Sequence, residues 1–129
     1  ATLLVSPLDG TVVVAGTHEG PGRQSEFLYV AYNAQTGRTK WVSGFSDPDF
    51  EVESMTAAAI SPDGSSFYLT GIGESVPGAP NESLTVAAKT ATGFLSWHQL
   101  HHGGQSVAVS PDSGTVYVVG GPITTAIRA

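Results

Sequence analysis

Short apolar stretches alternate along the chain with turn-forming glycine, proline, serine and aspartate. Valine, tyrosine and phenylalanine are frequent in these stretches, as they are in strands. No stretch combines a helical period of apolar positions with helix caps, so we predict an all-β chain. The expected strands are Thr2–Val5, Thr11–Ala15, Glu26–Asn33, Arg38–Ser43, Thr56–Ile60, Ser66–Thr70, Ser83–Lys89, Phe94–Gln99, Ser106–Val109 and Thr115–Val119, with the start of a further strand at Ile123–Ile127.

The pattern of strands and turns repeats. Ala31–Trp41 and Ala87–Trp97 both fit A-x-x-x-x-T-G-x-x-x-W, and the second copy begins 56 residues after the first. A Ser-Pro turn followed by a strand and glycine occurs three times, at Ser6–Gly16, Ser61–Gly71 and Ser110–Gly121. Self-similarity at such a period is typical of repeat architectures, in which one unit cannot bury its apolar face alone.

Four short strands in each repeat predict a segment of a β-propeller built from four-stranded antiparallel blades, about two and a half of them. The expected units are residues 1–54 for the first blade, 55–105 for the second and 106–129 for a partial third. A β-sandwich is the structural alternative, but its strands have no reason to resemble one another. Trp41 and Trp97 are expected to be largely buried at equivalent places in successive sheets.

The two Trp motifs resemble the tryptophan-docking motif of quinoprotein-type (PQQ-like) propeller repeats, and the Ser-Pro segments resemble bacterial YVTN-type repeats. In that family the tryptophan packs against the Thr-Gly turn of a neighbouring blade. The resemblance therefore implies a blade-docking role for Thr36, Gly37, Trp41, Thr92, Gly93 and Trp97. The aspartate usual in the motif is Asn33 in one copy and Lys89 in the other, and lysine cannot accept a hydrogen bond.

Composition narrows the classes of partner. The formal net charge is −6, from 11 acidic and 5 basic residues. Because binding to nucleic acid needs clustered lysine and arginine, this charge disfavours nucleic acid as a partner. No apolar run approaches the ~18 residues of a membrane-spanning helix. The absence of cysteine excludes disulfides and thiolate metal sites. We expect an extracytoplasmic location, periplasmic or secreted.

The candidate binding residues fall in long connections at Thr17–Ser25, Phe45–Ser54, Gly71–Glu82 and Leu100–Gln105, which strand order places opposite the Ser-Pro and Thr-Gly turns. The distance from tryptophan to the next Ser-Pro serine is 20 residues in the first copy and 13 in the second. Extra loop length is a sign of function. The candidates are Asp47, Asp49, Glu51, Glu53, His101 and His102. Their acidic charge suggests a cation or a basic protein as partner.

Two patterns in the sequence resemble metal sites without meeting their requirements. The carboxylates of residues 47–53 do not have the spacing of an EF-hand, and a solvated acidic loop is the simpler interpretation. His98 with His101 and His102 could ligate zinc or copper, but the three lie partly on a strand and partly in a loop, and surface histidines explain them as well. No metal site is predicted.

No nucleophile–base pair, phosphate-binding loop or cofactor motif is present in the sequence. We therefore expect a non-catalytic scaffold for interaction or ligand binding, without a cofactor and without catalytic residues. The alternative is a fragment of a quinoprotein-like propeller enzyme whose catalytic residues lie outside this chain. Three explanations of the incomplete ring stay open: a longer chain that supplies the remaining blades, which we favour, other copies of the same chain, or a different partner that supplies them.

Overall fold

The computed structural model describes residues 1–19, 25–47, 52–75, 82–101 and 104–129, and for residues 52 and 53 only the backbone. All regular secondary structure in these ranges is β, which confirms the all-β part of the predicted fold. No helix in the described part of the chain is long and apolar enough to cross a membrane.

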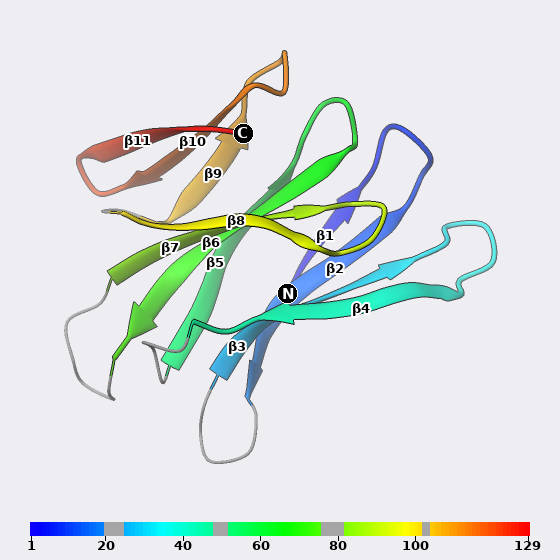
Figure 1. Cartoon of the computed structure of the whole chain (residues 1–129), viewed down its shortest axis with the longest axis horizontal. Coiled ribbons are helices and arrows are strands. Elements are labelled where there is room, and N and C mark those ends of the chain that lie inside the picture. The colour runs from blue at the N-terminus through cyan, green and yellow to red at the C-terminus, as the bar shows by residue number, and fades with distance from the viewer. Residues whose placement is uncertain (20–24, 48–51, 76–81, 102–103) are drawn as a thin grey trace.

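The strands form three antiparallel sheets that lie side by side (Figure 1). The first sheet contains β1 (Thr2–Val5), β2 (Val12–Glu19), β3 (Ser25–Tyr32) and β4 (Thr39–Phe45). The second contains β5 (Val52–Ile60), β6 (Ser66–Glu74), β7 (Glu82–Lys89) and β8 (Leu95–His101). The third contains β9 (Ser106–Val109), β10 (Thr115–Gly120) and β11 (Ile123–Arg128). In each sheet the strands neighbour one another in chain order.

The register of the first two sheets is the same. Ala31 on β3 is opposite Trp41 on β4, and Ala87 on β7 is opposite Trp97 on β8. Both pairings shift by a residue directly after the alanine. The two tryptophans therefore occupy equivalent places, as the repeat predicts. Each is partly buried and packs against one of the two apolar clusters between the sheets.

The strands reach further toward the long connections than the apolar pattern predicts. β2 continues to Glu19, β6 to Glu74 and β8 to His101, while β5 begins at Val52. The reason is that ladder hydrogen bonds join backbone groups, which polar residues supply as well as apolar ones. His18 opposite Glu26 is one such polar extension, with the histidine Nδ1 3.5 Å from the carboxylate across β2 and β3.

Two apolar clusters hold the sheets together, one in each interface. The cluster between the first and second sheets has as its buried members Leu4, Val13, Ala15, Phe27, Tyr29, Ala31, Phe45, Phe67, Leu69, Leu84, Val86 and Ala88. The cluster between the second and third sheets is smaller, with buried members Tyr68, Ala87, Val116, Val118 and Ile127. The first strand of the middle sheet, β5, contacts both β1 and β9. These contacts fix the order of the sheets.

Candidate functional site

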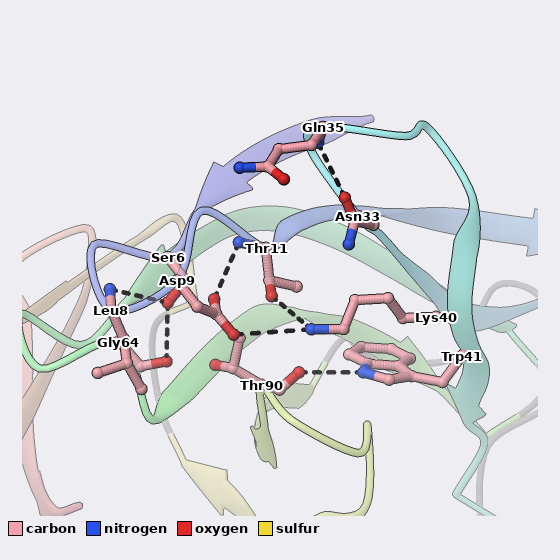
Figure 2. A network of polar contacts seen from close by, with 10 residues as sticks. All are labelled: Ser6, Leu8, Asp9, Thr11, Asn33, Gln35, Lys40, Trp41, Gly64 and Thr90. Atoms are coloured by element: carbon pink, nitrogen blue, oxygen red, sulfur yellow. Dashed lines mark hydrogen bonds and ion pairs between the residues drawn. The ribbon is translucent and has the colours of Figure 1, made fainter.

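Trp41 joins the first sheet to a turn of the second. Its indole Nε1–H donates to the carbonyl oxygen of Thr90 over 3.0 Å (Figure 2). Its ring stacks on Phe67, with centroids 5.9 Å apart and planes 10° apart, and meets Tyr29 edge-on. A β-carbon added at Gly93 would lie 2.6 Å from Cε3 of Trp41. Only glycine therefore allows this turn to approach the indole so closely.

The other residues with a predicted docking role lie in less enclosed places. The turn of Thr36 and Gly37 is exposed, and a β-carbon at Gly37 would meet no atom within 4 Å. Trp97 lies 6.0 Å from Tyr68, centroid to centroid, and packs against the cluster between the second and third sheets. Thr92 accepts a hydrogen bond from the amide of Phe94 and so shapes its own turn.

The Ser-Pro turns form a second connection between sheets. The hydroxyl of Ser6 donates to the carbonyl of Gly64 over 3.3 Å, and the amide of Asp63 donates to the hydroxyl of Ser113 over 3.2 Å. The Ser-Pro turn of each sheet is thus hydrogen-bonded to the Ser-Pro turn of the next sheet. Ser113 has a φ of 61°, at the place where the second turn has Gly64 with a φ of 75°.

Within each turn an aspartate carboxylate accepts hydrogen bonds. Ser61 and Ser65 donate to Asp63, and these bonds lower the pKa of Asp63 to about 2 from its usual 3.8. The hydroxyl of Ser110 does the same for Asp112, whose pKa is also lowered. The serines of the Ser-Pro motif therefore brace turns.

A polar hollow opens beside the first Ser-Pro turn. It is lined by Asp9, Thr11, Asn33, Ala34, Gln35 and Lys40. The ammonium of Lys40 lies 2.8 Å from the hydroxyl of Thr11 and 3.6 Å from the carboxylate of Asp9. The pKa of Asp9 is lowered, chiefly by the hydrogen bond from the amide of Thr11. Figure 2 shows these side chains next to the Trp41 contact. The Lys40–Asp9 ion pair and the hydrogen bonds of Thr11 thus provide partners for the charged groups of this hollow.

The structure brings few of the predicted binding residues together. Asp47 is only 6% exposed, so it is not the solvated loop carboxylate that the sequence suggests. Glu53 lies within β5, in the segment of which only the backbone is described. Asp49, Glu51 and His102 lie outside the described residues.

His101 belongs to a buried polar chain that the sequence pattern does not predict. Its Nε2 is hydrogen-bonded to the hydroxyl of Thr85, which in turn donates to the hydroxyl of Thr70 over 3.1 Å. Thr70 then donates to the carbonyl of Leu84 over 3.2 Å. Both threonines are completely buried. Since Thr85 is completely buried, solvent does not reach the hydroxyl that is bonded to His101.

An alignment of the two Trp motifs shows how the sequence could have predicted this hydrogen-bonded chain of side chains. Thr85 and His101 stand where the first repeat has Tyr29 and Phe45. Polar side chains at positions that are buried and apolar in the other repeat need hydrogen-bond partners. The alignment therefore suggests that these two residues bond to each other. The strand alternation also separates His98 from His101, because residues three apart point to opposite faces. The ring of His98 lies 4.9 Å from that of Phe45 on the first sheet.

Among the described residues no group of three histidine or carboxylate side chains is placed to hold a metal ion. Comparison with protein families and with curated proteins adds no identity. No family model matches the chain, and no curated protein matches it.

Proposed function

We propose that the chain is a β-propeller-type repeat segment that acts as a non-catalytic scaffold for interaction or ligand binding. The observation that carries this proposal is the repeated geometry of the sheets: the first two have the same register, and hydrogen-bonded turns join each sheet to the next, with the indole of Trp41 as a further link between the first two. A rigid array of this kind holds its variable connections in fixed places, which is how such scaffolds bind partners.

The partner of this scaffold is a cation or a basic protein bound at the acidic connection after β4. Asp47, at the start of that connection, is only 6% exposed and is therefore left out of the proposed contact residues. The proposed contact residues are Asp49, Glu51 and Glu53, which follow Asp47 in the sequence, together with His102. His101, at the end of β8, is bonded to Thr85 and is not among them. Exposed charges attract an oppositely charged partner less strongly as salt rises.

The test uses calcium and a lysine-rich peptide as defined probes. The triple variant D49N/E51Q/E53Q is compared with D9N/D63N/D112N, which removes the same number of charges from the turn side. Fluorescence polarisation for the peptide and calorimetry for calcium, at low and high salt, measure binding. The loop variant should weaken binding of at least one probe several-fold at low salt, since each exposed ion pair contributes about 0.2–1 kcal/mol.

Circular dichroism checks that both variants are folded. Equal weakening by the two triple variants, or binding by wild type that is independent of salt, would show that the acidic connection is not the site. A wild-type chain that binds neither probe would also overturn this part of the proposal.

A further inference from the structure

The two outward faces of the three-sheet array are apolar and exposed. On the third sheet, Tyr117 and Val119 point away from the second sheet and are 44% and 38% exposed. On the first sheet, Leu3 and Val5 point away from the second sheet and are 62% and 51% exposed. Val14 lies beside Leu3 on this outward face, and it lines an apolar hollow with Leu28, Val30 and Tyr32.

The outward face of the third sheet repeats a face that is buried elsewhere in the molecule. Counting from the Ser-Pro serine and along the ladder, Ala108, Tyr117 and Ala126 correspond to Ala59, Tyr68 and Ala87 of the second sheet. The residue types are identical at all three places. In the second sheet this face packs on the third, and Tyr68 is only 3% exposed.

The outward face of the first sheet repeats the surface that receives Tyr68. That receiving surface on the third sheet includes Val107, Val109, Val116 and Val118. The same ladder places on the first sheet hold Leu3, Val5, Val12 and Val14. Both surfaces are therefore strips of aliphatic side chains on the first two strands of a sheet. The outward face of the third sheet thus has the side chains of the tyrosine side of the interface between the second and third sheets. The outward face of the first sheet has the aliphatic character of the valine side of that interface.

We propose that copies of this chain associate head to tail, with the Tyr117 face of one copy packed on the Leu3–Val5 face of the next. Such an interface is heterologous: it uses two different surfaces and builds a ring or an open chain, according to whether the rotation between copies closes. Burial of these side chains supplies the driving force. The inference depends on the repetition of an interface and not on the acidic connection, so the probe-binding experiment above can fail without affecting it.

The experiment blocks one face at a time. Tyr117→Lys with Val119→Lys blocks the third sheet, and Leu3→Lys with Val5→Lys blocks the first; all four side chains are exposed, so the fold should tolerate lysine. Phe94→Lys is the matched control, because Phe94 is 71% exposed in the turn of the second sheet, outside both faces. Sedimentation velocity over a dilution series measures the mass. Wild type and F94K should form multiples of the 13.2 kDa chain as concentration rises.

Each blocked variant should sediment as a single chain. An equimolar mixture of the two should form a 1:1 dimer that grows no further, because one free face of each kind remains. Circular dichroism and melting curves of each variant establish that it is folded, and the milder Val119→Lys and Val5→Lys replace any double variant that is not. A wild type that stays a single chain at every concentration overturns the proposal. So does a blocked variant that still dimerises alone, since that would be a symmetric contact.

Discussion

The two interfaces between sheets use the same places of the repeat and fill them with different chemistry. The first sheet presents Tyr29 and Phe45 to its neighbour, and the second sheet presents Thr85 and His101 at the corresponding positions. The first interface is a continuous apolar core. The second is apolar only beside the Ser-Pro turns and becomes a hydrogen-bonded chain toward the other end. A repeated backbone therefore does not require a repeated core.

The difference has a physical consequence. Apolar packing needs no direction, so the first interface gains from every buried side chain. Buried hydroxyls must each find a partner, and a satisfied hydrogen bond contributes only about 0.5–1.5 kcal/mol net. We expect the first interface to be the stronger of the two. The third sheet should accordingly separate from the second before the second separates from the first.

The largest expected effect concerns the tryptophans. Trp41→Ala removes a stacked ring, an edge contact and a hydrogen bond to Thr90, and should lower the free energy of unfolding by about 3–5 kcal/mol. Trp97→Ala removes contacts with Tyr68 and the smaller cluster, and should cost less, about 1–2 kcal/mol. Urea unfolding followed by far-ultraviolet circular dichroism measures both. Equal costs would mean that the two interfaces are equally strong.

The turn glycines give a second, smaller contrast. Gly37 and Gly93 both have positive φ, 71° and 74°, so alanine at either place should cost roughly 1 kcal/mol for the backbone conformation. At Gly93 the new methyl group would also overlap the ring of Trp41, which adds about 1–3 kcal/mol of overpacking. In thermal unfolding, the melting temperature should be highest for wild type, lower for G37A and lowest for G93A. If G37A and G93A melt together, the indole does not depend on this close approach.

The polar chain can be converted to the chemistry of the first interface. Thr85→Val alone removes the partner of a histidine nitrogen, and should cost about 1–3 kcal/mol. The double variant with His101→Phe should cost less than the sum of the single changes, because the two residues are in direct contact. A double-mutant cycle in urea measures the coupling. Additive costs would indicate that the Thr85–His101 bond contributes nothing to the second interface.

The smallest effect tests the turns, which link both interfaces alike. Folding lowers the pKa of Asp63 to about 2 from 3.8, so the folded state favours the carboxylate. The stabilisation from Asp63 is then complete above about pH 4 and is lost as the pH falls from there toward 2. Asp63→Asn should lower the urea midpoint at pH 6 and make almost no difference at pH 2. A midpoint difference that stays constant with pH would contradict this account.

Much of the fold was readable from the sequence because its causes are local. Alternation of apolar and polar residues, the Ser-Pro and Thr-Gly turns and the two Trp motifs predicted the strands of the first two sheets to within a few residues. They also predicted β9, β10 and the place of β11. The strand ends were missed at Glu19, Glu74 and Val52, because ladder hydrogen bonds between backbone groups leave no apolar trace in the sequence.

The candidate binding residues show the limit of local patterns. A run of carboxylates suggested a solvated loop, yet Asp47 at its start is buried. The histidines close in sequence suggested a cluster, yet His98 contacts Phe45 of the first sheet while His101 bonds Thr85 toward the third. Burial and direction depend on what the neighbouring sheet places against a side chain.

The sequence by itself determined that this protein is a repeat of short antiparallel strands, because turn chemistry and side-chain alternation act within a few residues of the chain. Only the tertiary structure decided how the repeats meet. The approach of Trp41 to Gly93, the bond of Ser6 to Gly64 and the chain from His101 to Thr70 all join residues from different strands or sheets. Such contacts depend on distances that folding sets, and neighbouring residues in the sequence do not specify them.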